Sequence, residues 1–149
     1  MEFLSTRAYW FELSTKVRTP HARAVRALEE LDFQGMRIHI APQVLIEFRA
    51  VATRPLASNG LGISSVDAEQ HSLAFETAFS MVPESPAVFR IWKSLVSTAV
   101  VLGKQVHDAR LVSICLSAGI SQILTFNLGH FRRYIPFVPG LQILDPASY

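Results

Sequence analysis

Residues 106–127 read VHDARLVSICLSAGISQILTFN, and this stretch decides the fold class. After Arg110 the run is uncharged and mostly apolar to Ala118, which is typical of a buried helix. Gly119 stops that helix, and the short apolar run from Gln122 to Phe126 is typical of a buried strand. A buried helix that leads into a buried strand indicates an α/β domain with a parallel sheet.

The remaining sequence alternates strands and helices in the same way. We expect strands at 2–4, 36–40, 122–126 and 141–144, a short strand or connector at 81–83, a helical run at 9–13, and helices at 19–31, 42–53, 66–79, 86–100 and 106–118. Ser65 is the expected cap of the 66–79 helix, and 59–62 is an expected loop. This order indicates right-handed βαβ units. We therefore predict a three-layer α/β/α sandwich with a central parallel sheet, in one domain spanning 1–149.

The composition excludes several classes of protein. With 50% hydrophobic and 17% charged residues, the 149-residue chain is too apolar to be disordered. Its net charge of +2 is too small for a protein that coats nucleic acid, although most of its basic residues are Arg, which binds phosphate in a bidentate manner. The single cysteine, Cys115, is expected to be a buried hydrophobe in a reducing, cytoplasmic compartment. The five histidines show no zinc-binding spacing.

No membrane segment or signal peptide is expected. The run from Leu111 to Gly129 carries no formal charge, but its serines, glycines and amides interrupt it too often for a membrane span. The first residues lack a basic region followed by a long apolar stretch, so they do not resemble a signal peptide.

Glu47 is the first candidate site residue, because it lies on a helical face between Val44 and Val51. A carboxylate in an apolar stripe is costly unless a cation or a hydrogen-bond network stabilises it. Two interpretations stay open for it: a metal ligand, or a buried ion pair with an arginine.

Asp108 is the second candidate, at the start of a helix that is otherwise nearly all apolar. It either caps the helix or complements the helix dipole from the first turn, or it holds a divalent ion at the carboxyl edge of the sheet.

Asn127 is the third candidate, because it directly follows a predicted strand, where α/β proteins bind ligands. It is either a turn residue or, with Thr125 two positions earlier, a group that contacts phosphate or metal-bound water. Two acids and one amide at such positions would suit Mg²⁺ or Mn²⁺ chemistry on phosphate esters.

Several segments of the sequence resemble a known family. These segments are 41–48 (APQVLIEF), 52–56 (ATRPL) with 59–62 (NGLG), 106–112 (VHDARLV), and 124–127 (LTFN) with Phe131. They resemble PIN-domain proteins, and most closely the VapC-like ribonuclease toxins of bacterial toxin–antitoxin pairs. The resemblance covers nearly the whole chain, and it also implies an α/β/α sandwich.

The resemblance implies an acidic pocket that holds Mg²⁺ or Mn²⁺ and cleaves RNA. On the matching positions it implies Glu47, Asp108 and Asn127 as metal-binding and catalytic residues, and His130 stands where a further acid often lies. Thr125, Arg7 and Arg110 are the candidates for contact with the RNA substrate.

The first strand departs from the pattern of the family. That strand usually ends in Asp-Thr-Asn or Asp-Ser-Asn, whereas this chain has Ser5-Thr6-Arg7. Ser5 therefore replaces an acidic metal ligand, and Arg7 introduces a positive charge beside the pocket. Loss of such a ligand is expected to weaken metal binding at least about 10–100-fold.

Two functions follow from these observations. The first is a metal-dependent endoribonuclease, weakened by Ser5, with an antitoxin as protein partner. The second is a catalytically inactive PIN module that binds RNA or a protein partner. Aromatic residues of the segments 9–11 and 89–92 offer an apolar surface for a homodimer or a partner, or they belong to the core. A phosphoacceptor receiver domain is discounted, because it needs an acidic pair after the first strand.

Overall fold

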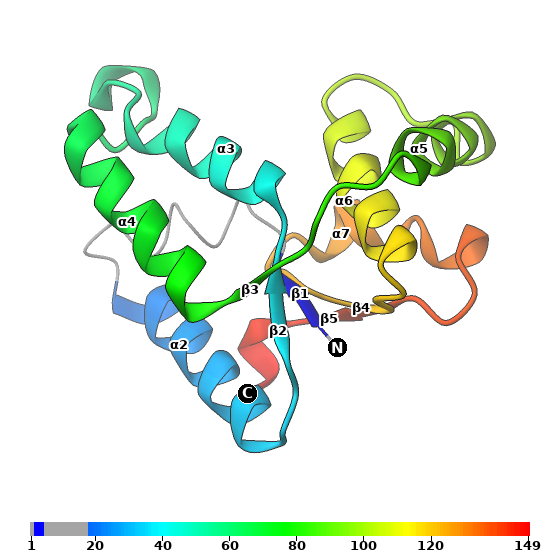
Figure 1. Ribbon diagram of the computed structural model, residues 1–149, viewed down its shortest axis with the longest axis horizontal. Helices are drawn as coiled ribbons and strands as arrows, with labels where there is room; N and C mark the ends of the chain where they lie inside the picture. Colours follow the sequence, from blue (N-terminus) through cyan, green and yellow to red (C-terminus); the bar gives the residue numbers. More distant parts are fainter. Residues whose placement is uncertain (1, 5–17) are drawn as a thin grey trace.

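A computed structural model describes residues 2–4 and 18–149 (Figure 1). In that part of the chain the strands are β1 (Glu2–Leu4), β2 (Ile38–Ile40), β3 (Ser80–Met81), β4 (Gln122–Leu124) and β5 (Gln142–Leu144). They form one sheet in the order β3-β2-β1-β4-β5, and every neighbouring pair is parallel. The predicted α/β class and the parallel pairing of its strands are therefore confirmed.

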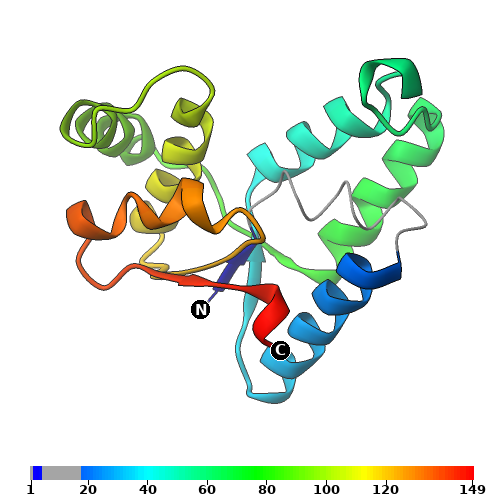
Figure 2. The ribbon, with the colours of Figure 1, turned by 180° about the vertical axis from the view of Figure 1, so that it is seen from behind.

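The helices lie on two sides of these strands. They are α2 (Arg18–Phe33), α3 (Pro42–Ala52), α4 (Ser65–Ala78), α5 (Ala87–Thr98), α6 (Gln105–Ser117) and α7 (Leu128–Arg132). Figures 1 and 2 show α2, α3 and α4 on one side of the strands and α5, α6 and α7 on the other. The chain ends in the turn η3 (Pro146–Ser148), which packs against α2 (Figure 2).

Helix α6 and strand β4 lie at the centre of the core, as the 106–127 stretch predicts. All residues of α6 from Leu111 to Cys115 are buried, and so are Ile123 and Leu124 of β4. Burial raises the pKa of the Cys115 thiol well above its ordinary value, so this side chain is an inert hydrophobe. Helix α5 packs along α6 and turns Val88 and Leu95 into the core.

Gly119 ends α6 as expected, with a positive φ of 70°. The amide of Ile120 donates back to the Cys115 carbonyl at 2.8 Å, and the Gly119 amide donates to Leu116 at 3.2 Å. This pattern closes a helix through a left-handed residue, a conformation that glycine adopts without steric cost.

Some predicted boundaries are wrong by one or two residues. Ser64, and not Ser65, caps α4, because its hydroxyl accepts a hydrogen bond from the Asp67 amide at 3.0 Å. Strand β4 ends at Leu124, although the Thr125 amide still donates to the Leu144 carbonyl. The short helix α7 and the turn η2 (Ile135–Phe137) were not expected from the sequence.

The expected helical run at 9–13 and the residues Ser5 and Arg7 lie outside the described residues. Within the ranges 2–4 and 18–149, none of the helices combines the length and the apolar character that crossing a membrane requires.

Candidate functional site

Two of the three candidate residues follow strands that flank β1 in the sheet, and the third lies at the start of a helix. Glu47 lies in the second turn of α3, which begins two residues after β2. Asp108 lies in the first turn of α6, and Asn127 precedes α7 just beyond β4. In parallel sheets this carboxyl edge of the strands is where ligands bind.

Asp108 contacts His130 and, through it, Asn127. The Asp108 Oδ2 atom lies 3.1 Å from His130 Nδ1, and the Asn127 Nδ2 atom lies 2.9 Å from the same nitrogen. Asp108 is 14% exposed and His130 is 47% exposed. A ring nitrogen carries at most one proton, so Nδ1 either donates to Asp108 or accepts from the Asn127 amide. The structure thus brings these three side chains together.

The helix-cap interpretation of Asp108 is wrong. The residue at the N-cap of α6 is Lys104, which makes no side-chain capping bond, and Asp108 lies within the first helical turn. Its position there suits the positive end of the helix dipole.

The first turn of α6 is fixed by three side chains from other elements. The Tyr134 hydroxyl donates to the carbonyl of Gln105 at 3.2 Å, and the Trp92 indole Nε1 donates to that of Val106 at 2.9 Å. The Gln43 amide donates to the carbonyl of His107 at 3.0 Å. Three consecutive carbonyls therefore accept hydrogen bonds from side chains of three separate parts of the chain, which positions the backbone that carries Asp108.

The pKa of Tyr134 is shifted by burial and by the nearby Asp108 carboxylate. This side chain is fully buried, and its burial, with the Asp108 carboxylate, raises the pKa of Tyr134 to about 12, while Arg133 partly opposes the rise. The hydroxyl therefore stays protonated over the physiological pH range and remains a donor to Gln105.

Glu47 receives a hydrogen bond from Gln43 one helical turn earlier. The Gln43 Nε2 atom donates to Glu47 Oε1 at 2.8 Å, and the Gln43 Oε1 atom accepts from Arg110 Nη1 at 2.7 Å. Gln43 is only 6% exposed, whereas Glu47 is half-buried. Because Gln43 also binds the carbonyl of His107, it links Glu47 to the residue that precedes Asp108.

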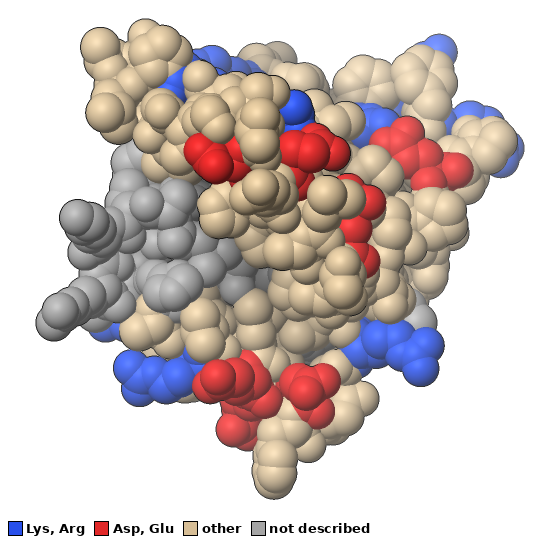
Figure 3. Space-filling view, turned by 60° about the vertical axis from the view of Figure 1, so that its left-hand side comes forward, with Lys and Arg blue, Asp and Glu red and all other residues tan. Residues whose placement is uncertain are grey.

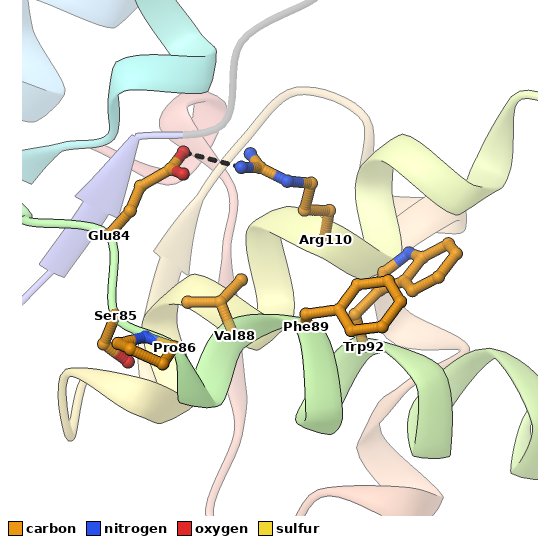
Figure 4. Close-up of a pocket in the computed structure, with 7 residues that line it drawn as sticks. All are labelled: Glu84, Ser85, Pro86, Val88, Phe89, Trp92 and Arg110. Carbon is orange, nitrogen blue, oxygen red and sulfur yellow. Dashed lines mark hydrogen bonds and ion pairs between the residues drawn. The ribbon is translucent and has the colours of Figure 1, made fainter.

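Arg110 is held by two partners in the structure. Besides Gln43, its Nη2 atom pairs with Glu84 Oε1 at 2.6 Å, as Figure 4 shows. Both side chains are partly exposed, at 34% for Arg110 and 43% for Glu84. The guanidinium proposed from the sequence for substrate contact thus already binds a carboxylate and an amide.

Thr125 is buried, and its hydroxyl accepts a hydrogen bond from the Asn127 amide at 3.0 Å. This contact orders the turn between β4 and α7. The turn-residue interpretation of Asn127 therefore describes its backbone, while its side chain points to His130.

Sequence reasoning missed two residues of the hydrogen-bond network around Glu47 and Arg110. Gln43 carries a signal that could have been used, because it stands four positions before Glu47 on the same helical face, directly after Pro42. Glu84 carries none: it lies 26 residues from Arg110 in the sequence, and only the fold brings the two side chains together.

The oxygen atoms of Glu47, Asp108 and Asn127 are of the type that a hard cation binds, but the described residues offer few carboxylates at this site. Carboxylate and amide oxygens are ligands that Mg²⁺ and Mn²⁺ accept. In the part of the chain that the structure describes, however, no group of three or more His, Cys, Asp or Glu residues is arranged to hold a metal ion. Figure 3 shows the acidic side chains of one face in a band and a second, separate group, with basic side chains beside both.

Solved structures share this fold. The chain matches the VapBC2 complex of Rickettsia felis bound to a promoter DNA fragment, with a TM-score of 0.67 and 17% identity over 97% of this chain and 98% of that one. The fold is that of the VapC- and FitB-type PIN-domain toxins. FitAB bound to the IR36 DNA fragment matches with a TM-score of 0.62 and 18% identity, over 99% of this chain and 96% of that one.

A third match is VapC20 of Mycobacterium tuberculosis, described as a toxin that cleaves the sarcin–ricin loop. Its TM-score is 0.57 at 18% identity, over 87% of this chain and 92% of that one. No family model and no curated protein sequence matches the chain. The resemblance to PIN-domain toxins is therefore seen in the comparison of structures and not in the comparison of sequences.

Proposed function

We propose that this chain is a toxin-type PIN domain that hydrolyses RNA phosphodiesters with Mg²⁺ or Mn²⁺, and that Ser5 weakens its metal binding. The proposal includes a single domain over 1–149 with helices in two layers around the sheet, the α/β/α sandwich. The contact of Gln43 with both Glu47 and the His107 carbonyl carries it, because it ties α3 to the start of α6, where Asp108 lies.

In this proposal Glu47 and Asp108 would hold the metal ion, and Asn127 would contribute its amide oxygen. The bound ion would activate water and stabilise charge on the phosphate. Gln43 keeps the Glu47 carboxylate oriented, and the fixed first turn of α6 does the same for Asp108. Arg7, Arg110 and Thr125 are the proposed contacts of the RNA near the centre.

The proposed protein partner is an antitoxin. Two of the structural neighbours are toxin–antitoxin complexes bound to DNA, which supports a partner of this kind. The proposed substrate is RNA, in keeping with the description of VapC20 as a cleaving toxin. A homodimer is part of the same proposal.

A specific observation favours the second candidate function, an inactive PIN module that binds RNA or a partner. His130 stands where the family often places an acid, and in the structure it contacts Asp108. Neither His130 nor Ser5 adds negative charge, so among the residues proposed for the centre Glu47 and Asp108 supply the carboxylates.

The deciding experiment is cleavage of a mixed RNA substrate with Mn²⁺, with and without EDTA. The chain as it stands should cleave weakly, Ser5→Asp should cleave faster, and Ser5→Asp with Arg7→Asn faster still. Ser58→Asp, which adds the same charge in the exposed turn η1 (Leu56–Ser58), is the matched control and should change nothing. Absence of EDTA-sensitive cleavage in every variant would contradict the nuclease proposal and favour the inactive module.

A further inference from the structure

A cavity of about 350 Å³ opens beside the candidate centre. Its lining residues come from α5, from the segment that precedes it and from α6: Glu84, Ser85, Pro86, Val88, Phe89, Trp92 and Arg110 (Figure 4). One wall is aromatic and the other is an ion pair. We propose that this cavity binds an unpaired guanine base of RNA, an inference that rests on the proposed nuclease function and adds a base preference to it.

The aromatic wall is a stacking platform. The rings of Phe89 and Trp92 are stacked, with centroids 5.6 Å apart and planes 26° from parallel. Phe89 is 66% exposed, so a ring face is open to a ligand. The Trp92 indole is anchored by its hydrogen bond to the Val106 carbonyl, which keeps the pair in place. Unpaired RNA bases stack on such rings.

The opposite wall carries a donor beside an acceptor. Arg110 presents N–H groups and Glu84 presents carboxylate oxygens, and the two are paired at 2.6 Å. The Watson–Crick edge of guanine offers the acceptor O6 beside the donors N1–H and N2–H, which matches this order. Adenine offers one acceptor, N1, and one amino donor, N6–H, so it can make only one hydrogen bond to the carboxylate, whereas guanine can donate both N1–H and N2–H to it.

The same ion pair argues for a base and against an apolar peptide side chain. An apolar group placed over Glu84 and Arg110 would remove water from both charges and return no hydrogen bond. A flat base with donors and acceptors on one edge satisfies the ion pair and the rings together. Arg110 is also joined through Gln43 to Glu47, so a base bound here belongs to a nucleotide near the proposed centre.

The test is a binding measurement without metal, so that cleavage cannot interfere. The probe is a fluorescein-labelled uridine strand with a single central guanosine, compared by anisotropy in EDTA with the same strand carrying adenosine. The unmodified chain should bind the guanosine strand more tightly. Phe89→Leu should weaken this binding about 5- to 150-fold, the range expected for one stacked base, and Phe89→Tyr should retain it.

Two further variants separate stacking from edge recognition. Phe33→Leu changes an 87% exposed phenylalanine of α2 that does not line the cavity, and it should leave binding unchanged. Glu84→Gln should lower the affinity for the guanosine strand to that for the adenosine strand, because one carboxylate oxygen becomes a donor.

Equal binding of the two strands by the unmodified chain, or equal effects of Phe89→Leu and Phe33→Leu, would overturn the guanine site. In that event the cavity would be open to a protein partner. A guanine preference that disappears in Phe89→Leu supports the site even if no Mn²⁺-dependent cleavage is found, which would refute only the nuclease. Cleavage with an unchanged guanine response in Phe89→Leu would refute only the base site.

Discussion

Two clusters of side chains hold the carboxylates of the candidate centre, and they do so differently. The Asp108 cluster consists of Asp108, Asn127 and His130. The Gln43 cluster consists of Gln43, Glu47, Glu84 and Arg110. In the Gln43 cluster the buried Gln43 amide donates to Glu47, and the always-charged Arg110 guanidinium donates to Gln43 and to Glu84. In the Asp108 cluster the Asp108 carboxylate contacts a histidine, which is charged only when it is protonated.

The two clusters position Glu47 and Asp108 in different ways. The Gln43 cluster connects three segments of the fold, namely α3, α6 and the segment before α5, and within it the Gln43 amide positions the Glu47 carboxylate. Asp108 is placed by the backbone of α6, whose first-turn carbonyls accept hydrogen bonds from other parts of the chain, and its carboxylate contacts a half-exposed residue of α7. Added negative charge should therefore act mainly on the Asp108 side.

The largest expected effect comes from neutralising either carboxylate. In the Ser5→Asp background, Glu47→Gln and Asp108→Asn should each lower the rate of Mn²⁺-dependent RNA cleavage at least about 100-fold, because each removes a proposed metal ligand. Asp32→Asn, an exposed acid of α2, is the control and should retain full activity. A large loss from only one of the two would show that the clusters do not form one centre.

A second change tests the histidine. His130→Asp should raise Mn²⁺ affinity about tenfold, since it places a carboxylate beside Asp108. Without metal the same variant should melt at a lower temperature than His130→Asn, because two like charges then face each other. Addition of Mn²⁺ should remove that difference. Equal Mn²⁺ affinities of the Asp and Asn variants would exclude position 130 from the centre.

The Gln43 cluster is tested through stability. Gln43→Leu should lower the free energy of unfolding by about 1–3 kcal/mol, because it leaves partly buried donors and acceptors of Arg110 and His107 without their partner. Gln34→Leu removes an exposed hydrogen bond to Glu30 and should cost less than about 0.5 kcal/mol. Urea unfolding measures both variants, and equal losses would deny the cluster a structural role.

Much of the fold was predictable from local patterns, and the site was predictable only in part. The uncharged run after Arg110, with Gly119 behind it, correctly predicted α6 and β4. The positions of Asp108 and Asn127 followed from these elements, because helix starts and strand ends share one sheet edge. Glu84 could not be predicted, since no local pattern reveals a partner 26 residues away. The roles proposed for Ser5 and Arg7 stay predictions, because both lie outside the described residues.

The smallest effect is expected at Tyr134, which supports the helix of the Asp108 cluster. Near pH 7, Tyr134→Phe should cost about 1 kcal/mol, the value of its hydrogen bond to Gln105. The pKa of Tyr134 is raised from 10.0 to about 12, so the unfolded chain loses this proton first as the pH rises. The stabilisation is complete below pH 10 and is lost as the pH rises through about 12.

Unfolding titrations of both proteins between pH 7 and 12 check this dependence. The unmodified chain should lose stability with rising pH faster than Tyr134→Phe, which has no phenol to ionise. Parallel curves for the two proteins would contradict the assignment of the shifted pKa to Tyr134.

The central claim is that Glu47 and Asp108 form one metal centre that lacks a carboxylate at position 5. Calorimetric titration of Mn²⁺ into the unmodified chain, Ser5→Asp, and Ser5→Asp with Asp108→Asn tests it most directly. We expect Ser5→Asp to bind Mn²⁺ about 10–100-fold more tightly than the unmodified chain, and Asp108→Asn to cancel that gain. Equal affinities of the unmodified chain and Ser5→Asp, or a gain that persists in Ser5→Asp with Asp108→Asn, would contradict the account.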